Sequence, residues 1–226
     1  MSLRIPFPDR AEAGRALAER LAERLAEEGD WRDALVLALP RGGVPVAWQV
    51  AERLGLELDI LVVRKLGTPG NPELAMGAIA SGGVQVMNED ILRYVHVSHA
   101  EIEGTLVQET HELQRREHAY RGNRPRPTIE RRAVVLVDDG LATGATMRAA
   151  VQAVRKLGAS SVTVAVPVAA PDSVALLEPL ADRIVCLHLP HDLYAIGRWY
   201  EDFDQTPDRQ VVELLQRAWH RKGEAQ

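Results

Sequence analysis

The stretch VVLVDDGLATGAT, residues 134–146, decides the fold class of this 226-residue chain. It begins with β-branched and aliphatic residues, which predict a buried strand, and it ends in small residues and hydroxyls at the start of a helical pattern. Asp138 and Asp139 lie between the two, where the strand reaches the surface. Ligands of open α/β sheets bind beyond the carboxyl ends of the strands, so this acid pair falls where a binding site is expected.

Similar apolar runs alternate with helical patterns on both sides of this stretch. Because the runs are continuous rather than alternating, they predict an α/β fold with a mostly parallel sheet flanked by helices. We expect one domain over 1–226, with a core at about 30–187, an inserted helix at 98–121 and a hood at about 188–226 to which N-terminal residues could contribute. Strands are expected at 34–39, 58–63, 133–138, 162–168 and 183–189, a hairpin around Gly82-Gly83, and helices at 9–28, 46–55, 145–158, 172–180 and 208–220.

Composition and charge exclude several classes of protein. The net charge is −5 and no polybasic run occurs, which argues against nucleic acid or an anionic membrane as the partner. The longest apolar run, 162–170, is far shorter than the roughly 20 residues that span a membrane. The single cysteine excludes an intramolecular disulfide and a cysteine-based zinc cluster. Since the N-terminus lacks an apolar signal core, we expect a cytoplasmic protein.

Residues 143–146, Thr-Gly-Ala-Thr, are suited to hold an anion. They can present successive backbone N–H groups and hydroxyls, and the following helix adds the positive end of its dipole. Acceptors beside such a cradle suit a sugar phosphate, with carboxylates on the ribose hydroxyls and amides on the 5′-phosphate. Two alternatives stay open from the acid pair alone: Asp139 caps the helix while Asp138 only ends a strand, or the pair binds magnesium as in receiver domains.

The whole stretch resembles the signature of type I phosphoribosyltransferases, which use phosphoribosyl pyrophosphate (PRPP). The part DDGLATGATM is most similar to adenine phosphoribosyltransferase within that family, and a looser similarity covers residues 34–200. The resemblance implies that Asp138 and Asp139 hold the ribose hydroxyls, with Asp139 contributing to catalysis. It also implies that both acids reach Mg²⁺ indirectly, through PRPP and water, and that the 5′-phosphate is wrapped by Ala142, Thr143, Gly144, Ala145 and Thr146.

Two further segments fit a pyrophosphate site. PRGGVP, 40–45, ends the first core strand, where Arg41 offers a fixed positive fork and Gly42-Gly43 permit unusual backbone geometry and close approach. The resemblance implies that this loop grips pyrophosphate, often through a cis peptide. Arg64 and Lys65 open a Gly/Pro-rich segment, 66–76, which we expect to be a mobile lid, and Glu73 within it is a candidate general acid or base. Taken alone, PRGGVP would also suit an ordinary turn, and Arg64 and Lys65 would suit a solvated strand end. Glu73 would also suit an ordinary exposed glutamate.

The C-terminal region would form the hood over the acceptor base. Tyr194, Trp199 and Tyr200 are candidates to stack on it, and Glu201 or Asp202 to accept from an amino group, although each aromatic taken singly also suits core packing. This hood does not match the adenine enzymes. Enzymes for hypoxanthine and guanine carry an acid where this chain has Ala142, and a lysine in the strand that is 162–168 here. We therefore expect a base other than a 6-oxopurine, with a slight preference for adenine.

The predicted function is magnesium-dependent transfer of the phosphoribosyl group from PRPP to a nitrogenous base, with release of pyrophosphate. The alternative is a PRPP-sensing regulator with little or no transferase activity. We also expect a homodimer, because Ile102, Leu106 and Leu113 share one face of the long helix. The competing interpretation is that this apolar stripe packs on the chain's own sheet.

Overall fold

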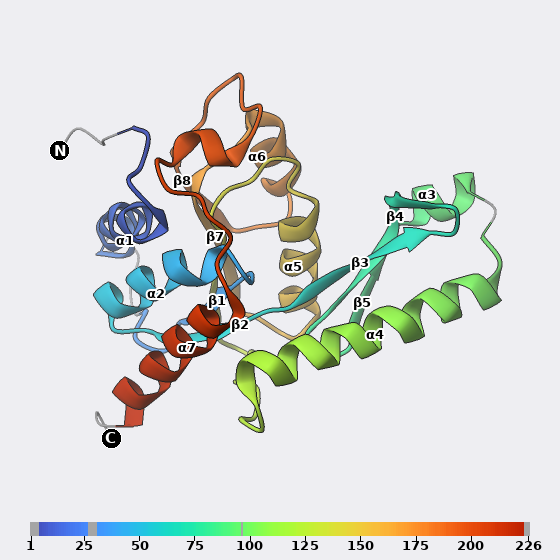
Figure 1. Cartoon of the computed structure of the whole chain (residues 1–226), viewed down its shortest axis with the longest axis horizontal. Helices are drawn as coiled ribbons and strands as arrows, with labels where there is room; N and C mark the ends of the chain where they lie inside the picture. The colour runs from blue at the N-terminus through green and yellow to red at the C-terminus, as the bar shows by residue number, and fades with distance from the viewer. Residues whose placement is uncertain (1–4, 27–30, 96, 224–226) are drawn as a thin grey trace.

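The computed structural model describes residues 5–26, 31–95 and 97–223, which form a main body and a projecting arm (Figure 1). The body is built on five parallel strands in the order β2-β1-β6-β7-β8. β1 pairs with β2 on one side and with β6 on the other. The strand bounds are β1 Leu35–Ala38, β2 Glu57–Ile60, β6 Ala133–Val137, β7 Ser161–Val168 and β8 Arg183–His188.

Helices cover both faces of this sheet, which explains why its strands are apolar on both sides. On β1, Val36 and Ala38 point into a core shared with α1, α2 and α7, whereas Leu35 and Leu37 point into a core under α5 and α6. The prediction of a mostly parallel sheet flanked by helices is confirmed. The helix bounds in the body are α1 Arg10–Ala26, α2 Gly43–Leu54, α5 Ala145–Lys156, α6 Pro171–Leu177, the 3-10 helix η1 Ile196–Trp199 and α7 Asp208–Gly223.

The local signals that begin and end helices act as the sequence predicts. The Asp9 carboxylate accepts from the backbone N–H of Glu12 at 2.8 Å at the start of α1. α2 ends at Gly55, whose φ of 69° is the left-handed conformation that glycine adopts at least cost. Among the described residues, no helix is both long and apolar enough to cross a membrane.

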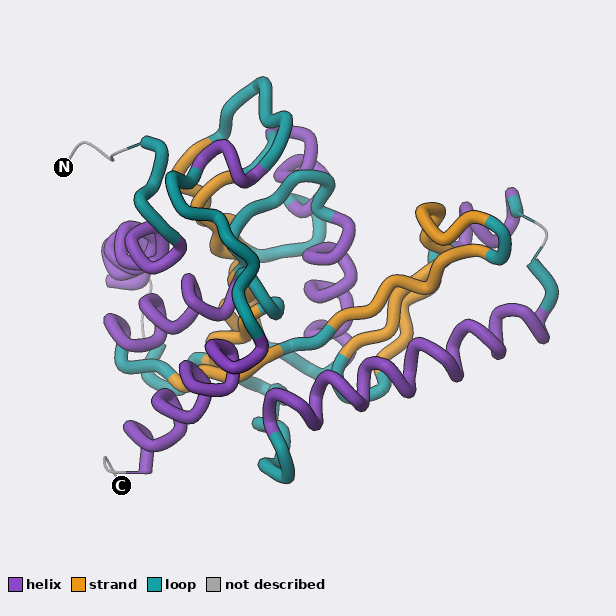
Figure 2. The backbone as a smooth tube through the Cα atoms, in the orientation of Figure 1, coloured by secondary structure: helices purple, strands orange, loops and turns teal. Residues whose placement is uncertain are grey.

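The arm is a three-stranded antiparallel sheet backed by a long helix, as the tube in Figure 2 shows. β4 pairs with both β3 and β5, and α4 packs along β3 and β4. Ser98 begins α4 with a capping box to Glu101, as the sequence predicts. The bounds in the arm are β3 Val63–Thr68, β4 Asn71–Ala80, β5 Val84–Met87, α3 Glu89–Tyr94 and α4 His99–Arg121.

The segment 66–76 forms the end of this hairpin rather than the irregular loop expected from its glycines and prolines. β3 and β4 turn at Pro69-Gly70, where Gly70 has a φ of 79°. Gly67 allows the two strands to approach closely, because a Cβ there would lie 2.7 Å from the backbone of Pro72. The register shifts at the same place, on both sides of Gly67. Gly67 therefore permits a β-bulge within paired strands. A count of glycines and prolines does not distinguish such a bulge from a loop.

The apolar stripe of α4 packs within its own chain. Leu113 is buried, and Ile102 and Leu106 pack against the core that contains the arm strands. The competing interpretation of this stripe is therefore correct, and the stripe no longer supports a homodimer. The homodimer itself stays a prediction without that argument.

Candidate active site

The acid pair lies at the carboxyl end of β6, as the sequence predicts. The backbone N–H of Asp139 donates to the Asp138 Oδ1 at 2.8 Å, so the two acids share one local turn. Burial and the neighbouring Asp139 carboxylate raise the pKa of Asp138 well above its usual value. Asp139 instead has a cationic partner: Arg10 Nε donates to its Oδ2 at 2.8 Å, and both side chains are largely buried. The two adjacent acids thus occupy different electrostatic environments.

The anion cradle stands between the acid pair and α5. Gly144 precedes the helix with a φ of 69°, so glycine is required there, and α5 begins at the next residue. The loop is fixed from the neighbouring helix, because Ser173 Oγ donates to the Ala142 carbonyl at 2.7 Å. The first turn of α5 leaves its N–H groups without helical partners, and these are the donors that bind an anion. Residues 142–146 therefore have the backbone geometry of a phosphate site.

The loop after β1 packs directly against the acid pair. A Cβ at Gly42 would lie 2.0 Å from the Asp139 Oδ2, and one at Gly43 would lie 2.7 Å from the Val137 carbonyl. Gly42 has an ordinary φ of −61°, so its requirement for glycine is steric and not conformational. The peptide between Pro40 and Arg41 is cis, in agreement with what the family resemblance implies. The two segments that the sequence predicted separately thus form one continuous surface.

Arg41 lies at the edge of this surface, beside the start of α7. Its Nη1 is 3.6 Å from the Asp208 Oδ1, which also accepts from the Tyr120 hydroxyl at 2.9 Å. Burial and the bond to Asp208 raise the pKa of Tyr120 to about 12, so its hydroxyl stays protonated and can donate. The Arg41 side chain is one-third exposed and remains accessible to a ligand.

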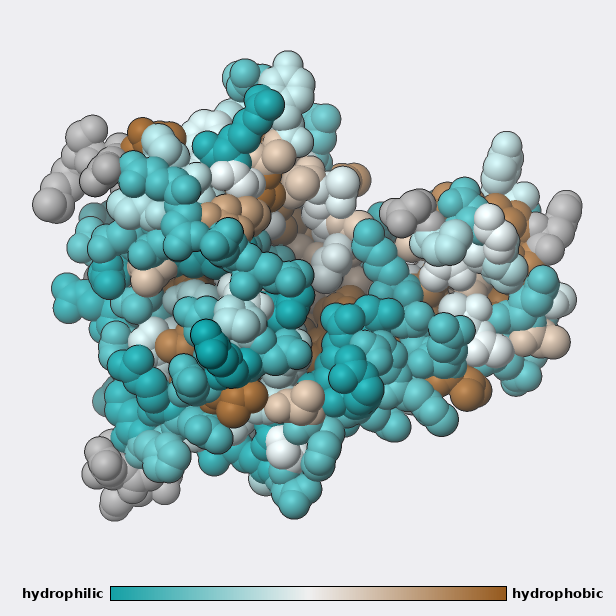
Figure 3. All heavy atoms as spheres, viewed as in Figure 1, coloured by the Kyte–Doolittle hydropathy of each residue, from teal (hydrophilic) through white to brown (hydrophobic). Residues whose placement is uncertain are grey.

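Arg64 and Lys65 point to opposite faces of the arm, since neighbours on a strand alternate. Arg64 faces α4, where its Nε donates to the Glu109 Oε2 at 2.7 Å. Lys65 faces α5 and lines a cavity of about 160 Å³ together with Thr143–Thr146 and Arg148. Figure 3 shows the molecule hollowed between body and arm, with apolar surface in the hollow. The structure therefore brings Lys65, and not Arg64, to the anion cradle.

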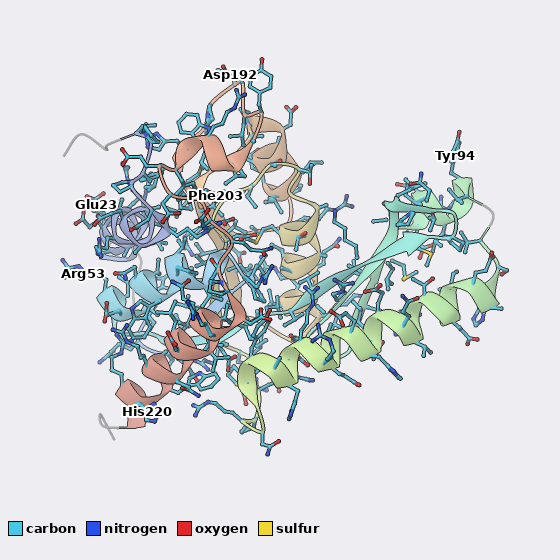
Figure 4. The ribbon with its side chains drawn as sticks, in the orientation of Figure 1. Glu23, Arg53, Tyr94, Asp192, Phe203 and His220 are labelled. Atoms are coloured by element: carbon cyan, nitrogen blue, oxygen red, sulfur yellow. The ribbon has the colours of Figure 1, made fainter. Side chains whose placement is uncertain are left out.

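Tyr194 and Trp199, both nominated for the base, differ in exposure. Tyr194 is 79% exposed on the loop after β8, where the Arg198 guanidinium lies 5.5 Å from the centre of its ring. Figure 4 shows Asp192 at the tip of that loop, away from Phe203 at the middle of the molecule. Trp199 is partly buried and stacks on His188, with ring centroids 5.9 Å apart. Of the two, Trp199 lies closer in the fold to the strand ends, because His188 ends β8.

A cover lies over the acid pair, and it joins residues near the N-terminus to the region expected to form the hood. Residues 7–8 pair with 199–202: the Phe7 N–H donates to the Trp199 carbonyl and the Glu201 N–H to the Phe7 carbonyl, each at 2.8 Å. Tyr200, the third aromatic nominated for the base, is buried and reaches inward from this pairing, where its hydroxyl donates to the Asp139 carbonyl at 2.6 Å. No local signal marks Phe7 or Arg10 for this role, because their partners lie about 190 and 130 positions away in the sequence.

Two further predictions concern Glu73 and the metal ion. Glu73 belongs to β4, but its side chain lies outside the described residues. Within the described ranges, no group of three or more His, Cys, Asp and Glu side chains is placed to hold a metal ion. Two adjacent acids, one of them bound to an arginine, suit a metal that the ligand's own oxygens hold and that the acids contact through water.

Comparisons with known proteins agree with this geometry. The family model of the phosphoribosyl transferase domain matches residues 9–197. Two proteins of Mycobacterium tuberculosis, from strains CDC 1551 and H37Rv and provisionally named phosphoribosyl transferases, are each 47% identical over 97% of this chain. The match covers 48% of their length, so this chain spans about half of these relatives.

A solved structure extends the similarity to the fold. The crystal structure of TT1426 from Thermus thermophilus superposes with a TM-score of 0.81 at 44% identity. The superposition covers 92% of this chain and 97% of that one, so it includes the arm as well as the body. Taken with the strand-end acids, the anion cradle and the family model, this places the chain in the phosphoribosyl transferase domain family.

Proposed function

We propose that the chain is a magnesium-dependent phosphoribosyltransferase that transfers the 5-phosphoribosyl group of PRPP to a nitrogenous base and releases pyrophosphate. The observation that carries the proposal is the contact of two chain segments, which hold three groups of residues, at one sheet edge. The acids after β6 touch Gly42 after β1, and the cradle at Gly144 follows on the same chain segment. Such a surface matches a ligand with a diol in the middle and a phosphate at each end.

Each segment has a distinct role in this reaction. The N–H groups of the cradle hold the 5′-phosphate, while Asp138 and Asp139 accept from the ribose hydroxyls. Lys65, which the sequence suggested for the pyrophosphate, is reassigned to the 5′-phosphate because it lines the same cavity as the cradle. As the bond from C1 to the pyrophosphate oxygen breaks, positive charge develops on the ribose and negative charge on the leaving group. Arg41 would stabilise that leaving group, and an interaction that strengthens as charge develops raises the rate. A nitrogen of the base then bonds to C1, and its proton passes to the released pyrophosphate or to water.

Magnesium would supply charge neutralisation on the pyrophosphate, as divalent cations do in phosphate chemistry. The donor set supports an indirect role for Asp138 and Asp139, through water and the oxygens of PRPP. A calorimetric titration of PRPP with and without Mg²⁺ tests this proposal. Equal affinity in both conditions would contradict the dependence on magnesium.

The acceptor is proposed to be an adenine-like or pyrimidine base, held by Trp199 and not by Tyr194. The partly buried indole offers a flat apolar surface near the strand ends, whereas Tyr194 is largely in solvent. Pyrophosphate release would be measured with adenine, hypoxanthine, guanine, xanthine, uracil and orotate. We do not expect a 6-oxopurine, because position 142 is alanine and not an acid, and β7 contains no lysine. A clear preference for hypoxanthine or guanine would contradict this assignment.

A second candidate is a PRPP sensor, and one observation favours it. Two charged groups of the candidate site already have partners within the chain: Asp139 with Arg10, and Arg41 with Asp208. A ligand that must replace such partners can be bound without efficient turnover. Tight PRPP binding together with no pyrophosphate release from any of the six bases would favour the sensor.

We further propose a homodimeric, cytoplasmic protein. Sedimentation at micromolar concentration measures the assembly directly, because one chain has a mass of 24.9 kDa. A mass near that of one chain would contradict the dimer.

A further inference from the structure

Arg10 is an unusual residue to find at this site, because it belongs to the N-terminal helix and lies 129 positions from Asp139. Its guanidinium is held on three sides. Nε donates to the Asp139 Oδ2, Nη1 donates to the Asp204 carbonyl at 2.8 Å, and the group lies 3.9 Å from the centre of the Phe203 ring. With the side chain only 12% exposed, little freedom remains.

Asp139 is held equally firmly from the other side. Gly42 closes one side of its Oδ2, since even a Cβ there would lie 2.0 Å away, and Tyr200 fixes its carbonyl. Arg10 engages Oδ2, so Oδ1 is the oxygen that would accept from a ribose hydroxyl. The carboxylate therefore presents one defined oxygen to the ligand, in one orientation.

We propose that Arg10 is a positioning residue for ribose recognition, which acts by fixing the Asp139 carboxylate against Gly42. This inference rests on the proposed function, because it assigns Arg10 to the diol part of the PRPP site. Removing two charges from water is costly, so a largely buried ion pair of this kind is weak evidence for a role in stability. Its role here would be the placement of an acceptor for a cis-diol.

The position of Arg10 separates ribose recognition from phosphate recognition. α1 lies on the face of the sheet that carries α2 and α7, whereas the cradle begins α5 on the opposite face. Loss of Arg10 should therefore weaken ligands with a ribose diol and leave inorganic phosphate unaffected. A residue that only supports folding would change both, or neither.

The test compares binding of PRPP, ribose 5-phosphate and inorganic phosphate by the full chain and its variants. Arg10→Gln should weaken PRPP and ribose 5-phosphate by about tenfold, as expected for a misplaced charge-assisted hydrogen bond, with phosphate affinity unchanged. Arg10→Lys should recover part of the loss, because it keeps the charge. Arg15→Gln is the matched control, since Arg15 lies on the exposed side of the same helix and pairs with Glu12.

Each outcome decides between named alternatives. Unchanged ribose 5-phosphate affinity in a folded Arg10→Gln protein would overturn the inference while leaving the proposed function intact. Tighter binding would also overturn it, because Arg10 would then compete with the ligand for Asp139. Equal losses for all three ligands would show a structural role. Absence of PRPP binding by the unaltered protein would instead contradict the proposed function itself.

Discussion

The ligand edge of the main sheet and the cover above it differ in how the chain builds them. At the edge, each functional group lies in a short segment that ends one strand and begins one helix, as in residues 134–146. In the cover, Phe7, Arg10 and Tyr200 come together from the two ends of the chain. The first kind of site follows from local geometry, whereas the second depends on long-range packing. We therefore expect the edge to carry most binding energy and the cover to refine it.

The largest effect should come from the edge itself. Replacing both acids, Asp138→Asn with Asp139→Asn, should remove charge-assisted hydrogen bonds to the ribose worth roughly 1.5–3 kcal/mol each. Calorimetry with PRPP measures the loss, and a thermal unfolding curve shows that the variant is folded. Unchanged affinity for PRPP in the folded double variant would show that the acid pair does not bind the ligand. The sheet edge would then not carry most of the binding energy.

A smaller effect is expected where the edge is packed most tightly. Gly42→Ala forces a Cβ against the Asp139 carboxylate, and overpacking of this kind destabilises by roughly 1–3 kcal/mol. Gly104→Ala is the matched control, because that position lies within α4 with open space around it and should gain up to about 1 kcal/mol. The free energy of unfolding in urea gives both values. Similar values for the two variants would show that the loop after β1 moves away from Asp139 readily.

These positions show what the sequence predicts well. The strand, the acids and the start of the following helix depend on neighbours within a few residues, and all lie where residues 134–146 place them. Gly42 was identified as well, for unusual backbone geometry and for close approach, and only the close approach applies to it. The parallel sheet followed from continuous apolar runs, because a strand that is buried on both faces leaves no alternation.

Other features could not be predicted, for identifiable physical reasons. Gly67 and Pro72 indicate a loop by composition, but here they form a bulge in paired strands. The opposite orientations of Arg64 and Lys65 followed only once β3 was known to be a strand. Arg10 is one of many arginines, and nothing near it in the sequence shows that it meets Asp139. Tyr194 was nominated because it is aromatic, and the residue type alone does not determine how exposed a side chain is.

The two faces of the arm offer the next prediction. Lys65→Ala should weaken inorganic phosphate and PRPP by about tenfold, because a lysine beside the cradle would lose a charge-assisted contact. Arg64→Ala should change both affinities by less than about twofold, since its partner is Glu109. Calorimetric titration of the two single variants with inorganic phosphate and with PRPP measures both affinities. A larger loss for Arg64→Ala would mean that the pair with Glu109 opens and that Arg64 turns toward the ligand.

The smallest expected effect is a pH dependence in the cover. His188 ends β8 under Trp199, and among the described residues its Nε2 is a buried atom without a hydrogen-bond partner. Burial lowers the pKa of His188 below its usual value, because the charged ring is poorly solvated there. The unfolded chain therefore binds a proton at His188 at a higher pH than the folded chain does. The contribution of His188 to stability is present above the ordinary pKa near 6.5 and is lost as the pH falls.

His188→Gln, which does not titrate in this range, should reduce the fall in unfolding free energy between pH 7 and pH 5. Urea unfolding at the two pH values checks this, with His220→Gln as the control because that ring is exposed on α7. If His188→Gln and the unaltered protein lose the same stability, the ring has access to water and the cover is more open than its contacts indicate.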